Sequence, residues 1–219
     1  MKKWFALLLM VCMMASVALA EEGGTVVYTE DFEGEECSVV LWDETTGTIE
    51  VVEDEDGNHV LMCVTNTGDD VNGYIHAIFG PQVGDFDLTM RVRPDNIKNP
   101  DYNWMKICSR AYVAEGEDGG ENESYIFEIW DWRGAFSIKS TVNRRSETKK
   151  LDENQDFWFI NGEWYDVRIE ARGSTLTVYV DDKECVSMTD PDDLFMEGAF
   201  ALCSWGVNFS VDDIVVTAY

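Results

Sequence analysis

Short runs of alternating apolar and polar residues follow one another along the chain, separated by turns rich in Gly, Asp and Asn. This period of two is typical of half-buried strands, whereas helical periodicity is scarce. The predicted strands are 25–32, 48–54, 59–66, 74–80, 86–94, 103–113, 124–132, 135–141, 164–172, 175–182, 198–205 and 207–219. About a dozen strands at such close spacing predict an all-β fold, an antiparallel two-sheet sandwich, rather than alternating β and α units.

The clearest hairpin is formed by WYDVRIEAR (164–172) and TLTVYVDD (175–182). In both segments apolar residues alternate with polar ones, so one face is expected to be buried and the other wet. Gly173 supplies the turn between them. The pair Asp181 and Asp182 closes the second segment and predicts another tight turn rather than a ligand site. The basic stretch 143–150 is interpreted as a solvated hairpin end.

The N-terminus reads MKKWFALLLMVCMMASVALA, which is two lysines, an apolar run and the small residues Ala18-Leu19-Ala20. This order is typical of a secretory signal peptide. The expectation is therefore a signal peptide over 1–20, a single domain over 21–219 and a secreted protein. No later segment is apolar for the roughly 18 residues that a membrane helix needs, so no membrane span is expected.

Acidic residues dominate the charge, with 43 Asp and Glu against 16 Lys and Arg and a net charge of -27. Because nucleic acid is bound by neutralising its phosphates with Lys and Arg, it is excluded as a partner. After the leader, the cysteines are Cys37, Cys63, Cys108, Cys185 and Cys203. The absence of a CxxC pair, with two histidines in all, does not support a zinc cluster. Export permits disulfides, but their pairing stays open, as does the oligomeric state.

Three stretches carry a resemblance to a known superfamily. They are GDFDLTMRVRP (84–94), GEWYDVRIEARGSTLTVYVDDKECVSMTD (162–190) and LFMEGAFALCSWGVNFSVDDIVV (194–216). They resemble the concanavalin A-like lectin and glucanase jelly rolls, specifically the LamG-like and 3-keto-disaccharide hydrolase type domains. The resemblance implies a jelly-roll sandwich with a concave sheet. It does not fix the function, since this fold hosts lectins, binding modules, hydrolases and lyases.

The most informative stretch for a site is ESYIFEIWDWRG (123–134). Alternation puts Tyr125, Phe127 and Ile129 on a core face and leaves Glu128 beside Trp130 on the other face. In the preceding strand, Trp104, Lys106, Cys108, Arg110 and Tyr112 share one face. By resemblance this face lies on the concave sheet, with Arg110 pointing into its groove near Glu128.

Aromatic rings beside charged groups suit sugars, because a pyranose stacks its apolar face on an indole and its hydroxyls need polar partners. The leading hypothesis is a secreted, noncatalytic, carbohydrate-binding domain that holds a poly- or oligosaccharide. The expected ligand-binding residues are Arg110, Glu128, Trp130, Trp104 and Lys106. Further tryptophans that could contribute to the groove are Trp132, Trp158 and Trp205.

A glycoside hydrolase or lyase is the alternative, with Glu128 as acid or base and Asp131 or a loop acid as its partner. Glu128 and Asp131 are three residues apart and so fall on opposite faces of a regular strand. The paired-acid signature of family 16 glucanases is thus absent. The 3-keto-disaccharide hydrolase pattern is matched by Tyr125, Ile129 and Asp131, but Ile126 stands where that pattern has Glu, and Glu128 where it has Gln. A third reading is a protein-binding adhesion domain of laminin-G type.

Acidic residues at both ends of the domain suggest a cation site. Asp31 and Glu33 belong to the first predicted strand region, and Asp212 and Asp213 to the last. If the terminal strands pair, as they do in such jelly rolls, these carboxylates would lie close together. Clustered carboxylates suit calcium, so a structural calcium ion is predicted there.

Overall fold

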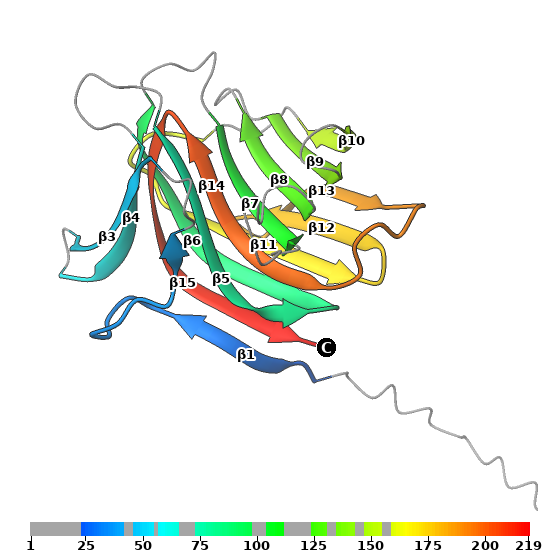
Figure 1. Ribbon diagram of the computed structural model, residues 1–219, viewed down its shortest axis with the longest axis horizontal. Coiled ribbons are helices and arrows are strands. Elements are labelled where there is room, and N and C mark those ends of the chain that lie inside the picture. The colour runs from blue at the N-terminus through cyan, green and yellow to red at the C-terminus, as the bar shows by residue number, and fades with distance from the viewer. Residues whose placement is uncertain are drawn as a thin grey trace, which may run out of the picture.

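The chain folds into two antiparallel β-sheets packed face to face (Figure 1). The computed structural model describes residues 23–41, 46–54, 57–65, 73–97, 104–111, 124–130, 135–142, 147–154 and 159–219. Within these ranges every regular element is a strand. In the same ranges there is no helix of the length and apolar character needed to cross a membrane. The predicted all-β, antiparallel two-sheet jelly-roll sandwich is confirmed. The predicted signal peptide, 1–20, lies outside the described residues.

The eight-stranded sheet is organised around the C-terminal strand. Its order is β13 (Lys183–Thr189), β12 (Thr175–Val180), β11 (Tyr165–Arg172), β6 (Phe86–Ile97), β15 (Val207–Ala218), β4 (His59–Val64) and β3 (Thr48–Glu53), with β1 (Thr25–Glu30) paired to β15. Glu30 lies opposite Ile214, so the terminal strands pair as expected. Figure 1 shows β1 in blue running beside β15 in red.

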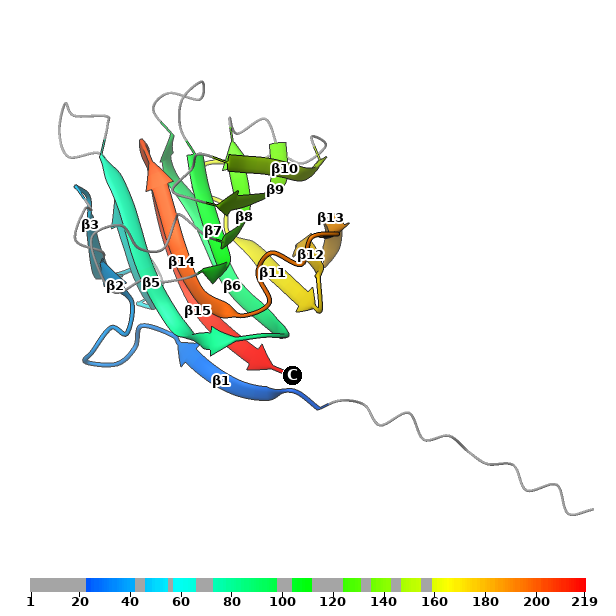
Figure 2. The same ribbon diagram turned by 45° about the vertical axis from the view of Figure 1, so that its right-hand side comes forward.

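The seven-stranded sheet forms the other layer. Its order is β10 (Glu147–Asn154), β9 (Ala135–Val142), β8 (Ser124–Trp130), β7 (Trp104–Ala111), β14 (Gly198–Trp205), β5 (Tyr74–Val83) and β2 (Val40–Leu41). Figure 2 shows β5, β14 and β7 side by side, with β9 and β10 at one margin of the sheet. Because β14 lies between β5 and β7, segments far apart in the sequence become neighbours here.

Side-chain alternation places one continuous core between the sheets. Phe86 of β6 meets Phe200 of β14 edge to face at 4.8 Å between ring centroids, and Phe200 stacks on Phe79 of β5 at 5.6 Å. Apolar residues of β11 and β12, such as Val167 and Val178, are buried against the same core. Burial of this apolar area is the main favourable term for folding.

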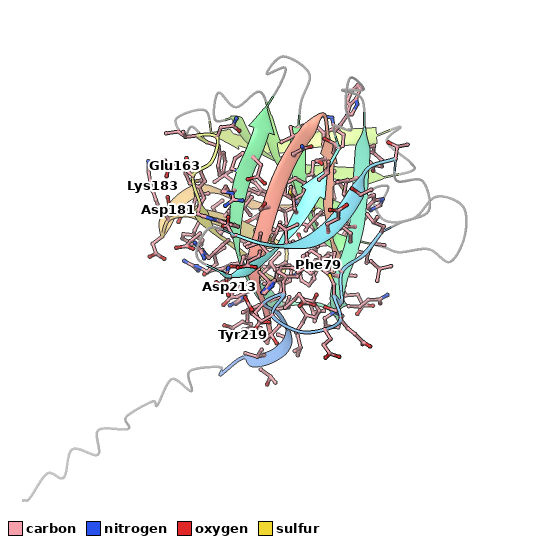
Figure 3. The ribbon with its side chains drawn as sticks, turned by 90° about the vertical axis from the view of Figure 1, so that its left-hand side faces the viewer. Phe79, Glu163, Asp181, Lys183, Asp213 and Tyr219 are labelled. Atoms are coloured by element: carbon pink, nitrogen blue, oxygen red, sulfur yellow. The ribbon has the colours of Figure 1, made fainter. Side chains whose placement is uncertain are left out.

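The predicted hairpin of 164–172 and 175–182 is confirmed by the pairing of β11 with β12, from Val167 opposite Val180 to Arg172 opposite Thr175. The turn at Asp181 and Asp182 is also present. Both residues have positive φ, 50° and 60°, which aspartate tolerates better than most residues. This turn leads directly into β13, and Figure 3 labels Asp181 and Lys183 there.

Three strands were missed by the sequence pattern, and one of them is the two-residue strand β2. β10 takes up part of the basic stretch that was interpreted as a solvated hairpin end, and β13 follows the turn after β12. All three lie at an edge: β10 and β2 at the two ends of the seven-stranded sheet, and β13 at one end of the eight-stranded sheet. An edge strand is held mainly by hydrogen bonds to one neighbour, so it can be rich in charged residues and show little apolar alternation.

Candidate functional site

Three rows of side chains cross the outer face of the seven-stranded sheet, the face turned away from the eight-stranded sheet. The pairing register of β5, β14, β7 and β8 defines them. The aromatic row is Tyr74, Trp205 and Trp104; the polar row is His76, Cys203, Lys106 and Glu128; the apolar row is Ile78, Ala201, Cys108 and Ile126.

Alternation along each strand explains why these residues share a face. In β7, Met105 and Ile107 enter the core between the sheets, so Lys106 and Cys108 point the other way. In β8, Tyr125 and Phe127 are in that core, which leaves Glu128 on the outer face. Tyr125 and Phe127 thus agree with the predicted core face, whereas the side chain of Ile129 lies outside the described residues.

The aromatic row lies across β5, β14 and β7. Trp205 is opposite both Tyr74 and Trp104 in the register. The rings of Tyr74 and Trp104 meet edge to face, with their centroids 6.1 Å apart and an interplanar angle of 68°. Trp205 is 37% exposed, and the other two are half-buried. The row therefore offers accessible aromatic surface.

The polar row runs directly beside the aromatic row. The Lys106 ammonium lies 3.6 Å from the centroid of the Trp104 ring and 4.0 Å from a Glu128 carboxylate oxygen. Glu128 and His76 are each only 3% exposed. A buried carboxylate needs a compensating partner, and Lys106 is a cation close enough to serve. The row thus combines an ammonium, a carboxylate and an imidazole next to an indole.

Trp130 and Asp131 were both predicted to belong to the site, and the structure describes only the backbone of Trp130. The backbone of Trp130 lies opposite Trp104, one position beyond the aromatic row. Its side chain is outside the description, as is the whole of Asp131. The prediction that they take part in the site therefore stays a prediction.

Arg110 was expected in the groove beside Glu128, but the structure places it elsewhere. The register between β14 and β7 shifts at this point, because Ala199 pairs with Ala111 while Ala201 pairs with Cys108. Arg110 has a φ of +49° within this β-bulge. A bulge adds a residue to one strand and re-aims the side chains around it. In the register, Glu128 is opposite Lys106, four residues from Arg110 along β7.

The Arg110 side chain instead joins three connecting segments and is completely buried. Its guanidinium donates to the carbonyl oxygens of Gly84 at 3.0 Å, Gly173 at 2.7 Å and Phe195 at 3.0 Å. It also donates to the Asp85 carboxylate at 3.2 Å. Burial lowers the pKa of the guanidinium, and the Asp85 charge opposes that shift. Arg110 is thus an internal anchor of the fold.

The four acids predicted to bind calcium have other partners. Asp31 accepts a hydrogen bond from the backbone N–H of Glu33 at 3.2 Å. The Glu33 carboxylate accepts from the His59 backbone N–H and contacts the His59 ring at 2.9 Å, which lowers the pKa of Glu33. Asp212 is buried and accepts a hydrogen bond from Asn58. Asp213 lies 3.9 Å from Arg91. In the described part of the chain, no group of three or more acidic, histidine or cysteine side chains could hold a metal ion. Calcium stays a prediction.

Sequence reasoning missed Tyr74 and His76 as members of this face. Both lie in a predicted strand, but only the pairing of β5 with β14 brings them beside Trp205 and Cys203. The alternation of Tyr74, His76 and Ile78 in YIHAIFG was the available signal, since these residues share one face of a strand.

Two antiparallel sheets packed face to face are the architecture of the concanavalin A-like jelly rolls. Residues 27–217 match the model of the 3-keto-alpha-glucoside-1,2-lyase-like domain. The chain belongs to this family, which confirms the resemblance seen in the sequence. A comparison with curated proteins found no match.

Solved structures with the same fold include carbohydrate-binding proteins and an enzyme. The carbohydrate-binding module CBM66 from Bacillus subtilis has a TM-score of 0.61 and 14% identity, over 83% of this chain and 96% of the module. The VIP36 exoplasmic/lumenal domain, in a form bound to Ca²⁺ and Man3GlcNAc, has a TM-score of 0.59 and 10% identity, over 89% and 90%. The Bacillus licheniformis beta-glucanase has a TM-score of 0.59 and 11% identity, over 90% and 99%. At these identities the likeness shows the fold alone.

Proposed function

We propose that this domain binds an oligo- or polysaccharide on the outer face of its seven-stranded sheet, which is the concave sheet implied by the family resemblance. The proposal rests on one observation, which is that the aromatic row lies directly beside the polar row. Indole and phenol rings provide apolar surface for the flat face of a pyranose. Lys106 and Glu128 provide a donor and an acceptor for its hydroxyls.

The kinds of protein that share the fold support this proposal. CBM66 is a carbohydrate-binding module, and VIP36 has been solved with an oligosaccharide. Ligand contact should begin at Trp205, Tyr74 and Trp104, because these are the accessible aromatic side chains among the described residues of the face. Lys106, which is half-buried between Trp104 and Glu128, then orients the sugar.

The test is binding of purified protein to a broad panel of glycans, followed by two tryptophan variants. Trp104→Ala should weaken binding at least about tenfold, or about 1.4 kcal/mol, because it removes the ring that meets Tyr74 edge to face and lies against the Lys106 ammonium. Trp130→Ala should do the same if its ring extends the row as the sequence predicts. The matched control is Trp164→Ala, because Trp164 stacks with Arg91 and Arg93 of β6 in the other sheet.

Each outcome of the panel has a definite meaning. Glycan binding that is lost in Trp104→Ala and kept in Trp164→Ala supports the proposed site. Unchanged affinity in Trp104→Ala contradicts it. Glycan binding that requires calcium would support the predicted calcium ion. If the protein binds none of the glycans, the adhesion alternative, in which the partner is a protein, becomes the favoured interpretation.

Catalysis by Glu128 is the second candidate. It is favoured by the burial of this carboxylate at 4.0 Å from Lys106, and by the lyase-like description of the family. A ketone at C3 of a sugar acidifies the proton at C2, so a carboxylate could act as the base that removes it. The test incubates a 3-keto-disaccharide with the protein. Sugar release that disappears in Glu128→Gln, with the fold intact, would establish catalysis.

Export of the protein belongs to the same proposal, since the N-terminal 20 residues have the order of a signal peptide. N-terminal sequencing of the protein recovered from outside the cytoplasm should give Glu21 as the first residue. A start at Met1 would contradict export by this leader.

A further inference from the structure

The polar row holds one ammonium and one carboxylate, and the two charges already compensate each other. The Lys106 ammonium lies 4.0 Å from a Glu128 carboxylate oxygen and 3.6 Å from the centroid of the Trp104 ring. The side chain of Glu128 is 4% exposed and that of Lys106 is 13% exposed. A carboxylate withdrawn from water in this way depends on its cation, because loss of the cation leaves a buried charge without compensation. Lys106 therefore has no positive charge to spare for a second carboxylate.

The rest of the face supplies no further lysine or arginine. Among the described side chains of the three rows, Lys106 is the only residue of either type. Arg110, which lies further along β7, is turned into the interior, where it donates to three backbone carbonyls and to the Asp85 carboxylate. The chain as a whole carries a net charge of -27. Both the local charges and the field of the whole protein therefore oppose an anionic ligand.

We propose that the glycan bound on this face is neutral, and that Glu128 excludes acidic sugars such as uronic acids. This inference rests on the proposed function, since it names the class of glycan that the same site takes. The hydroxyl groups of a neutral sugar both donate and accept, so they can use Lys106 and Glu128 together without separating them. A uronic acid would bring a second carboxylate to Glu128, and the two would compete for one ammonium. Such an unfavourable contact is a source of specificity in its own right.

The accessible part of the face brings the sugar to this charge pair. The apolar row is closed at Cys108 and Ala201, which are completely buried, whereas the aromatic row is open or half-buried. A sugar stacked on the aromatic row has its edge toward the polar row, and Lys106 lies against the Trp104 ring at this border. The substituents at the edge of the sugar ring, including the carboxylate of a uronic acid, would then face Lys106 and Glu128.

The experiment uses the hexose oligosaccharides of the glycan panel, each in its neutral form and oxidised at C6 to the uronic acid. Calorimetric titration at about pH 8, above the ordinary pKa of histidine, should show at least about tenfold tighter binding of the neutral form. Glu128→Gln keeps the shape of the side chain, removes its charge and frees that of Lys106. In this variant the affinity for the acidic form should rise at least about tenfold. The matched control is Asp213→Asn, which removes one negative charge from the other sheet and should keep the wild-type preference.

Salt separates the effect of Glu128 from that of the net charge, and it does so with the wild-type protein if Glu128→Gln fails to fold. Salt at about 1 M shortens the Debye length to about 3 Å but screens buried charges much less, so the preference for neutral forms should persist there. The inference is overturned, with sugar binding intact, if the preference disappears at high salt or if acidic forms bind as tightly as neutral ones. A Glu128→Gln protein that binds neutral forms and still rejects acidic ones would also overturn it. If no glycan binds in either form, the proposed function fails as well.

Discussion

At the scale of single residues, Arg110 illustrates how a buried charge becomes part of a fold. Its guanidinium satisfies three backbone carbonyls and the Asp85 carboxylate, and none of its surface meets water. Since the carbonyls belong to three different connections, one side chain fixes their relative positions. The resemblance suggested a ligand-binding arginine here, but the contacts assign it a structural role.

Replacing Arg110 with Met should therefore destabilise the protein by about 3–5 kcal/mol, because the variant leaves buried carbonyls unpaired. Urea denaturation monitored by tryptophan fluorescence would measure the free energy of unfolding. The control is Arg168→Ala, because Arg168 is partly exposed, pairs with Glu170 and stacks on Tyr179. Its loss should cost no more than about 1 kcal/mol. Equal effects of both substitutions would contradict the anchoring role of Arg110.

At the scale of elements, the bulge in β7 and the start of β14 depend on each other. Gly198 begins β14, and a Cβ placed there would lie 2.3 Å from the carbonyl carbon of Arg110. Only glycine allows the two backbones to approach so closely. The glycine that opens β14 in the sequence is thus explained by the bulged residue on the neighbouring strand.

Gly198→Ala should lower stability by about 1–3 kcal/mol, since the backbone of one strand must shift to relieve the overlap. Thermal unfolding would show this as a lower midpoint temperature. Gly34→Ala is the control, because a Cβ at Gly34 meets nothing nearer than 3.8 Å. A Gly198→Ala protein as stable as the control would show that β14 can move away at little cost.

Elements also mark the limit of what the sequence could predict. The β11–β12 hairpin was readable because burial of one face imposes a period of two. The sequence correctly predicted that Trp104 and Lys106 lie on the outer face of β7. It could not predict the position of Arg110, because a bulge interrupts the alternation without a sequence signal. The rows themselves depend on long-range register, which aligns Cys203 with both His76 and Lys106. No local pattern encodes that alignment.

At the scale of the whole molecule, the net charge of -27 means that some carboxylates lie close to one another on the surface. On the outer face of the eight-stranded sheet, Asp213 and Asp166 line a pocket of about 320 Å³ together with Arg91. Asp213 follows the buried Asp212 in β15, and Figure 3 labels it near that surface. Partial burial raises the pKa of Asp213 above its ordinary value of 3.8, and the negative charges of Asp212, Asp31 and Asp166 add to the rise. Arg91 opposes the shift without cancelling it.

A carboxyl group whose pKa is raised on folding holds its proton more tightly in the native state than in the unfolded chain. Its contribution therefore favours the native state at low pH, and that contribution is lost as the pH rises from 3.8 through the native pKa. Asp213→Asn removes the ionised group, so the variant should be more stable than wild type at pH 7. The gain should be a few tenths of a kcal/mol, because the side chain is 58% exposed and screened by water.

The gain should vanish near pH 3, where Asp213 is neutral in both states, and it should shrink at high salt. Urea midpoints of both proteins at pH 7 and pH 3 would check this. Asn also suits the φ of +50° at this position, so a gain that is equal at both pH values would assign the effect to the backbone instead of the charge. A gain confined to neutral pH would show that the acidic surface of this domain is maintained at a cost in stability, as expected when solubility or a cationic partner favours the charge.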